Sequence, residues 1–179
     1  MSAITLPVVF GSLNAKGLID DRYTRAGVKL GCPRVSSLDG RLRPIYTVFS
    51  QRSDPRWTKA SCFLQTLQEA AALDQQNLAE LSAEVALMHD PCSPFELDLR
   101  AGGGDQIALS FEYPLTWSAV KLVKMYDDIM CMIQFLYSTG SLQGEDPLLV
   151  ARKLRQRAGM PVRRFLTRVS RDVASVDFL

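Results

Sequence analysis

The chain has 179 residues, 47% of them apolar, which is enough for one domain with a packed core and excludes disorder throughout. No stretch approaches the roughly 18 to 20 uncharged apolar residues that cross a bilayer, and the first residues lack the basic start and apolar run of a secretory signal. Cys32, Cys62, Cys92 and Cys131 form no Cys-x-x-Cys pair. We therefore expect a soluble, cytoplasmic protein with reduced thiols, no metal and no cofactor.

The net charge of +2 hides a segregated distribution. Residues 1–60 carry ten Lys/Arg against four Asp/Glu, residues 61–149 carry three against thirteen, and residues 150–179 carry eight against two. Basic ends of this kind either bind an anionic partner or pair with the acidic middle of the same chain. The charge pattern by itself leaves both interpretations open.

Residues 1–52 form a basic region that we predict to be rich in strands and loops. Ile4 to Phe10 is an apolar run typical of a strand, and Asp20 to Leu30 is a candidate short helix. Loop-forming residues follow, namely Gly31, Pro33, Ser36, Ser37, Asp39 and Gly40. One interpretation is that part of this region is an arm, which becomes ordered only against a partner.

Residues 53–179 are predicted to form a helical domain that begins with a long helix. Ser53 or Asp54 can cap this helix, and Pro55 suits its first position because a missing N–H costs nothing there. Asp74 stands where one more apolar residue of the buried face belongs. Pro91 and Pro94 should end the helix. Spacings of three and four define that face: Trp57, Ala60, Leu64, Leu67, Ala71, Leu78, Leu81, Val85 and Met88.

Residues 95–112 alternate between apolar and polar on both sides of a glycine run, a pattern typical of a β-hairpin. Pro114 then opens a second long helix, which Gly140 should end. Its apolar face is Leu115, Ala119, Leu122, Tyr126, Ile129, Ile133 and Leu136. We predict a mainly α protein with a small β component, in which the two long helices pack antiparallel to each other or against a second subunit.

Residues 146–174 are predicted to form two short basic helices. Asp146 and Pro147 start the first, Gly159 breaks it, and Pro161 starts the second.

The residues that catalytic sites require are not found in the necessary patterns. His89 is the single histidine, and its place near the end of the first long helix is typical of a helix-end residue. The glycines at 102–104 lack the Lys-Ser/Thr that completes a phosphate-binding loop. Asp127 and Asp128 are adjacent on a helix and so point in different directions. We expect neither an enzyme nor a small-molecule ligand.

The basic tail is the most informative group. Its members are Arg152, Lys153, Arg155, Arg157, Arg163, Arg164, Arg168 and Arg171. Arg164, Arg168 and Arg171 share one helix face, and Val162, Phe165 and Val169 lie on the opposite face. Arginine grips phosphate with two parallel hydrogen bonds, so such a helix suits a nucleic-acid backbone. A looser cluster near the amino terminus comprises Arg22, Arg25, Lys29, Arg34, Arg41 and Arg43.

Three short sequence segments occur in the same order as in a known protein family. Asp54-Pro55-Arg56-Trp57 opens the first long helix, the strand at 107–114 leads into a helix containing Met125-Tyr126-Asp127-Asp128, and Val162-Arg163-Arg164-Phe165 follows near the end. In this order the chain resembles, over residues 20–172, a family encoded on integrative conjugative elements and conjugative plasmids that includes the AcaB-type transcriptional regulators. It departs from the family pattern after Asp54-Pro55, where the family tends to have Tyr and an acidic residue.

The resemblance implies a bacterial DNA-binding protein that regulates the transcription of conjugative transfer genes, for example as a transcriptional activator. It also implies a homodimer with a ribbon-helix-helix-like arrangement. Its partners would be double-stranded DNA and a second copy of the chain, with no membrane partner. The basic residues named above, at both ends of the chain, are the predicted DNA contacts. The alternative is a non-enzymatic structural or adaptor protein of the conjugation apparatus, which would use the same surfaces to hold proteins.

Overall fold

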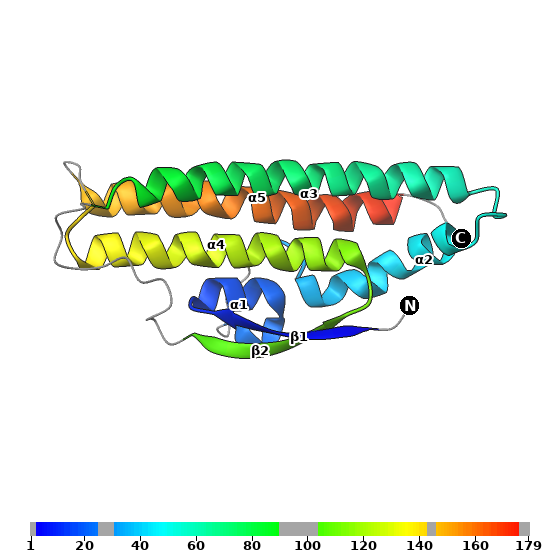
Figure 1. Cartoon of the computed structure of the whole chain (residues 1–179), viewed down its shortest axis with the longest axis horizontal. Helices are drawn as coiled ribbons and strands as arrows, with labels where there is room; N and C mark the ends of the chain where they lie inside the picture. The colour runs from blue at the N-terminus through cyan, green and yellow to red at the C-terminus, as the bar shows by residue number, and fades with distance from the viewer. Residues whose placement is uncertain (1–2, 25–30, 90–103, 143–145, 176–179) are drawn as a thin grey trace.

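Three long helices form the body of the protein, and a two-stranded sheet with two shorter helices covers one side of it (Figure 1). The computed structural model describes residues 3–24, 31–89, 104–142 and 146–175. The long helices are α3 (Trp57–Ala86), α4 (Pro114–Ser138) and α5 (Pro147–Ser175). The shorter elements are β1 (Ile4–Phe10), α1 (Leu13–Ile19), α2 (Leu38–Ser50), β2 (Asp105–Phe111) and single 3-10 turns at Asp21–Tyr23 and Val35–Ser37. The predicted class, mainly α with a small β component, is confirmed.

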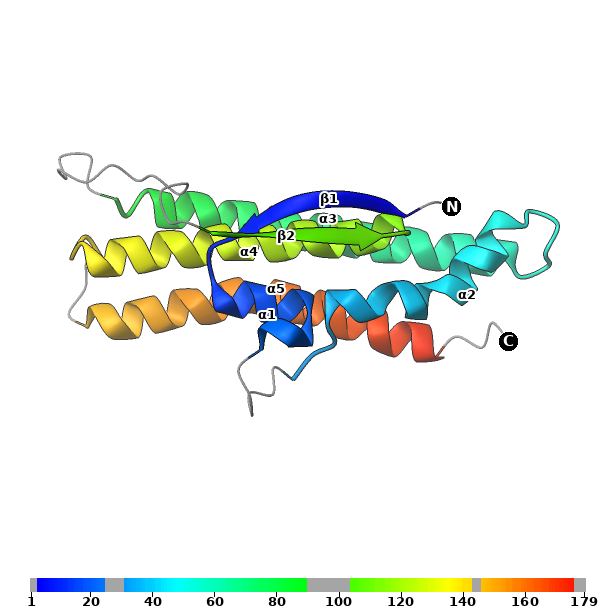
Figure 2. The same cartoon turned by 90° about the horizontal axis from the view of Figure 1, so that it is seen from below.

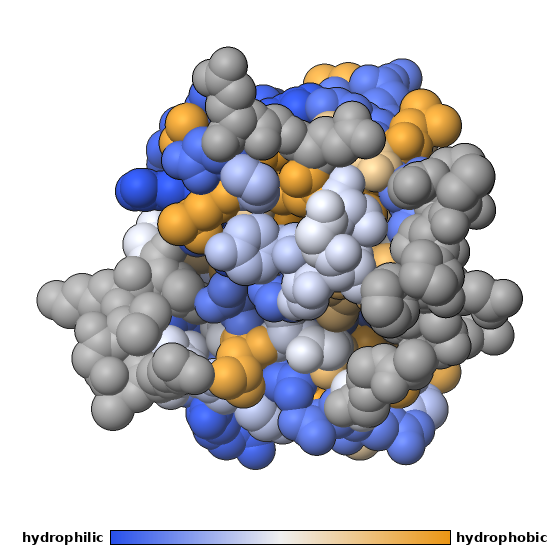
Figure 3. All heavy atoms as spheres, turned by 90° about the vertical axis from the view of Figure 1, so that its left-hand side faces the viewer, coloured by the Kyte–Doolittle hydropathy of each residue, from blue (hydrophilic) through white to orange (hydrophobic). Residues whose placement is uncertain are grey.

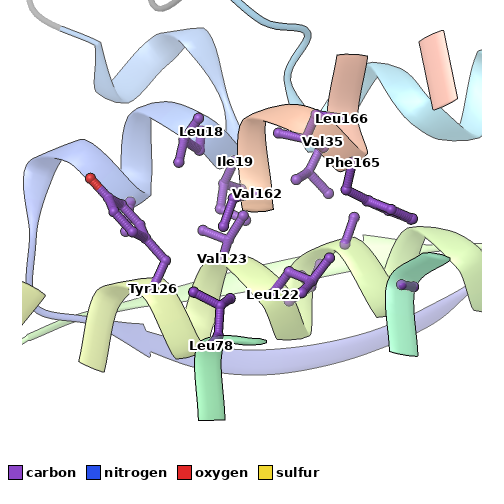
Figure 4. Packing of buried hydrophobic residues seen from close by; sticks show 14 of the residues in the cluster. Leu18, Ile19, Val35, Leu78, Leu122, Val123, Tyr126, Val162, Phe165 and Leu166 are labelled. Atoms are coloured by element: carbon purple, nitrogen blue, oxygen red, sulfur yellow. The ribbon is translucent and has the colours of Figure 1, made fainter. Parts of the chain in front are cut away.

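The periodicity of the two predicted long helices agrees with their buried faces. In α3, Ala60, Leu64 and each later apolar member through Val85 is buried, Trp57 and Met88 are half-buried, and Asp74 is buried among them. α4 is the central element, because it packs against α1, α3 and α5. Figure 4 shows part of the resulting core, where α1, α3, α4 and α5 contribute Leu18, Ile19, Leu78, Leu122, Val123, Val162 and Phe165.

The expectation that the two helices run antiparallel was wrong, because α3 and α4 run in the same direction (Figure 1). The His89 ring beyond the end of α3 lies 5.8 Å from the ring of Phe135 near the end of α4. A hairpin would return the chain to the end from which it left. Instead β2, which spans about 23 Å, carries the chain back along the bundle to the start of α4, and α5 runs opposite to both helices (Figure 2).

β2 forms where the second half of the hairpin was predicted, and it pairs antiparallel with β1, with Ile4 opposite Phe111 and Phe10 opposite Asp105. The first half of that hairpin, residues 95–99, lies outside the described residues. Among the described residues the sheet therefore joins segments that are about a hundred positions apart, which no local pattern could have indicated.

The tail forms one helix where two were predicted. α5 continues through Gly159 and Pro161, although a helix-interior glycine costs about 1 kcal/mol and a proline about 3 kcal/mol relative to alanine. The buried stripe Leu154, Ala158, Val162, Phe165 and Val169 offsets that cost. Full burial of a large apolar side chain contributes roughly 1.5 to 3 kcal/mol, so the stripe outweighs the two breakers.

Two carboxylates fix the corners between the sheet and the helices. Asp127 of α4 is 1% exposed and accepts hydrogen bonds from the backbone N–H groups of Gly11 and Ser12, both at 2.8 Å, where β1 turns into α1. Asp39 accepts bonds from the N–H of Glu112, at 2.7 Å, and from the Thr116 hydroxyl, at 2.6 Å.

Asp39 and Gly40, which were predicted to lie in a loop, belong to the first turn of α2. The described part of residues 1–52 packs onto the bundle, because Phe10, Ala15, Leu38, Leu42 and Ile45 are all fully buried.

Candidate nucleic-acid interface

α5 presents one apolar and one basic side, as its sequence predicted. Val162, Phe165 and Val169 are fully buried, whereas Arg163, Arg164 and Arg171 are exposed. This separation follows from helix geometry, because residues three and four apart share a face. The structure then divides the basic residues into those that pair within the chain and those that do not.

Two arginines of α5 pair with carboxylates of α3. The guanidinium of Arg157 donates to both carboxylate oxygens of Glu84, each at 2.7 Å. These bonds hold the pKa of Glu84 below its usual value. Arg164 forms an ion pair with Asp74, whose side chain is 4% exposed. The interpretation that the basic tail folds onto the acidic middle of the chain therefore holds for these two residues.

Three further arginines of α5 have partners nearby. Arg155 donates to the side-chain oxygen of Gln134 on α4 at 2.9 Å. Arg168 and Arg171 both contact Asp172, at 3.4 Å and 2.9 Å. The last two contacts are local and largely exposed, so water and salt compete with them easily.

Arg152, Lys153 and Arg163 are exposed and make no ion pair with the residues that the structure describes. Arg152 and Arg163 are eleven residues apart, which is about three helical turns, so both lie along one flank of α5, about 16 Å apart. We call Arg152, Lys153 and Arg163 the open cations. They can accept an outside anion without leaving a carboxylate of the described residues unpaired.

The amino-terminal cluster is more dispersed. Arg22 pairs with Asp20 at 3.1 Å, and Arg34 pairs with Asp21 at 2.6 Å. Burial raises the pKa of the Tyr113 phenol, and Arg43 opposes that rise. Arg41 is exposed on α2. Arg25 and Lys29 lie outside the described residues.

Cys32 feels the charge of one arginine from each of the two basic clusters. Burial raises the pKa of the Cys32 thiol, and the charges of Arg163 and Arg34 oppose that rise. Burial likewise raises the pKa of the Tyr126 phenol, and Arg163 and Arg155 oppose it. Arg163 of α5 and Arg34 of the amino-terminal region therefore both act on the Cys32 thiol, whereas Arg157 and Arg164 pair with carboxylates of α3.

The structure gives roles to several charged residues that the sequence left without a role. Asp127 and Asp128 diverge, since Asp127 is buried against the start of α1 while Asp128 pairs with Lys124 at the surface. Lys16 is 6% exposed and pairs with Asp105 of β2. Within the part of the chain that the structure describes, no three His, Cys, Asp or Glu side chains gather closely enough to hold a metal ion. Of these roles, the sequence indicated only that of Asp74, which stands at a position of the apolar face of α3.

No helix in the described ranges has both the length and the apolar composition needed to cross a membrane. A scan against protein-family models, a search of curated proteins and a search of solved structures each returned no match.

Proposed function

We propose that this protein is a DNA-binding transcription regulator of conjugative transfer genes that acts as a homodimer and has no enzymatic activity. The observation that carries the proposal is the set of open cations on α5. They extend along a single rigid helix instead of a loop. Cations about 16 Å apart on one rigid helix can contact two phosphates of a duplex at the same time.

The paired arginines contribute less in this proposal. Moving Arg164 to a phosphate would leave the buried carboxylate of Asp74 without its partner, which costs several kcal/mol. Arg157 would lose two hydrogen bonds to Glu84. The proposed contacts are therefore the open cations together with Arg41, and this set is narrower than the full set of predicted residues.

The test is the salt dependence of binding to duplex DNA from the operon that contains the gene. Each phosphate contact that is lost should reduce the slope of log affinity against log salt by about 0.9. We expect Arg152→Ala with Arg163→Ala to lower the slope by about 1.8 and to weaken binding on every duplex, since phosphate contacts carry no base information. Titration by fluorescence anisotropy at several salt concentrations measures both quantities.

Lys121→Ala is the control, because it removes one exposed positive charge from α4, a helix that carries none of the open cations. It should leave the slope unchanged. No binding of any duplex at low salt, or an equal loss in Lys121→Ala, would contradict the proposal.

The structural or adaptor alternative is favoured by one observation. β1 has no charged residue, and Ile4 and Leu6 are 57% and 47% exposed, which suits a protein partner. Under this alternative the protein binds duplex DNA weakly or not at all, so the same titration separates the two functions.

A further inference from the structure

A cavity of about 590 Å³ opens between α2, α3 and the first turn of α4. It lies at the end of the bundle where α3 and α4 begin and α2 crosses toward them (Figure 1). This volume falls within the range of roughly 300 to 1,000 Å³ that is usual for small-molecule sites. The open cations are on a different helix, and none of them lines this cavity.

The walls of the cavity include two aromatic rings that other rings hold in place. Tyr46 is 8% exposed and stacks on Tyr113 with ring centroids 4.4 Å apart. Phe49 stacks on Trp57 at 5.9 Å, and the indole N–H of Trp57 donates to the carbonyl of Phe49 at 3.0 Å. Tyr46 and Phe49 therefore have little freedom to close the cavity.

Phe49 remains 38% exposed although it is held by Trp57. Leu64 of α3, which is 4% exposed, and Pro114 of α4 complete the apolar surface of the cavity. A fixed, exposed aromatic ring beside an apolar cavity is the arrangement that binding sites for planar apolar groups use.

The remaining described lining is polar and uncharged. Ser50, Ser61, Gln65 and Gln68 contribute hydroxyl and amide groups, and none of the described Lys, Arg, Asp or Glu residues lines the cavity. The Gln65 amide already donates to Glu69 at 2.9 Å, so Gln68 is the amide on this wall without such a side-chain contact in the described structure. A ligand charge would enter this cavity without a counter-charge, which is unfavourable.

We propose that this cavity binds a neutral, planar aromatic small molecule with a hydrogen-bonding edge. The exposed ring of Phe49 packs on its face, Tyr46, Leu64 and Pro114 supply apolar contacts around it, and the Gln68 amide meets its edge. The inference does not depend on DNA binding, because it rests on residues that take no part in the proposed interface. It goes against the expectation from the sequence that the protein has no small-molecule ligand.

The test uses two dyes that differ by one charge. N-phenyl-1-naphthylamine is neutral and has an N–H at its edge, and 8-anilinonaphthalene-1-sulfonate is the same ring system with a sulfonate. We expect the neutral dye to bind the full-length protein with one site per chain and a rise in fluorescence. The sulfonate dye should compete at this site at least about tenfold more weakly, because its charge has no partner there.

Ser61→Trp fills the cavity and should weaken binding of the neutral dye at least about tenfold. Ser82→Trp is the matched control, since Ser82 is an equally half-buried serine on the same helix but does not line the cavity. It should bind the neutral dye like the unmodified chain. If circular dichroism shows that Ser61→Trp is unfolded, Gln68→Trp blocks the cavity from an exposed position and replaces it.

The inference is overturned if the neutral dye does not bind, if both serine variants bind it equally, or if the two dyes compete equally. It is also overturned if dye binding weakens as protein concentration rises, because the cavity would then be covered by a second copy of the chain.

Discussion

Asp74 occupies a position that the apolar pattern of α3 assigns to a core residue. Its side chain is 4% exposed, and its ion-pair partner Arg164 is 59% exposed. The two residues therefore differ in how much they depend on the ion pair. If the carboxylate is lost, Arg164 can return to water, whereas if the guanidinium is lost, a buried negative charge stays without a partner.

This inequality predicts opposite effects of the two substitutions. Arg164→Ala should lower the free energy of unfolding by about 2 to 4 kcal/mol, because it leaves the Asp74 carboxylate buried and unpaired. Asp74→Leu should be neutral or stabilising, because leucine completes the apolar stripe between Ala71 and Leu78. Urea unfolding followed by circular dichroism measures both values. Equal destabilisation by the two substitutions would show that the pair itself, and not the buried carboxylate, is what matters.

At the scale of the element, α5 shows how tertiary packing overrides local preference. Gly159 and Pro161 both oppose a helix, yet the helix continues because its apolar stripe is buried against α3 and α4. A side chain at position 159 would have room. A Cβ there would lie 3.8 Å from the ring of Tyr126 and 3.9 Å from the Arg163 side chain, which is ordinary van der Waals contact.

Gly159→Ala should therefore raise the free energy of unfolding by about 0.5 to 1 kcal/mol, because alanine loses less backbone entropy on forming a helix. The urea midpoint should rise while the slope of the transition stays the same. Gly104→Ala serves as the contrasting variant, because its Cβ would lie 2.9 Å from the carbonyl oxygen of Phe10. It should be destabilising, and a gain in stability at position 104 would contradict this account.

At the scale of the whole molecule, half of one sheet face is uncovered. Residues directly opposite each other in an antiparallel pair point to the same face, so Ile4 and Leu6 share a face with Phe111 and Leu109. Phe111 and Leu109 are buried against the bundle, whereas Ile4 and Leu6 are exposed. Figure 3 shows apolar patches on the end of the bundle at the left of Figure 1. Leu87, which follows α3, and Leu148 and Leu149 in the first turn of α5 are exposed apolar residues.

The ribbon-helix-helix-like homodimer that the family resemblance implies would pair β1 with β1 of the partner and bury Ile4 and Leu6. Leu6→Lys should then shift the protein from dimer to monomer in sedimentation velocity. Leu73→Lys is the matched control, because Leu73 is an exposed leucine on α3 and should leave the dimer intact. A chain that is monomeric at every concentration, or a dimer that survives Leu6→Lys, would contradict this arrangement.

The sequence by itself determined the features that depend on neighbours along the chain. The buried faces of α3 and α4, the strand at β2 and the two-sided character of α5 all follow from repeats of 3.6 or 2 residues. The acid at position 74 also stands out in the sequence, because it interrupts the apolar face of α3.

Only the tertiary structure decided how these elements meet. The parallel direction of α3 and α4 depends on the return path through β2, and the partner of β2 lies near the amino terminus. The pairing of Arg164 with Asp74 joins residues 90 positions apart, and that of Arg157 with Glu84 joins residues 73 apart. Local periodicity fixes which side of a helix is buried, but it carries no information about which distant side chain that helix will face. The division of the arginines into paired and open cations, and the cavity at α2, therefore became visible only in the folded chain.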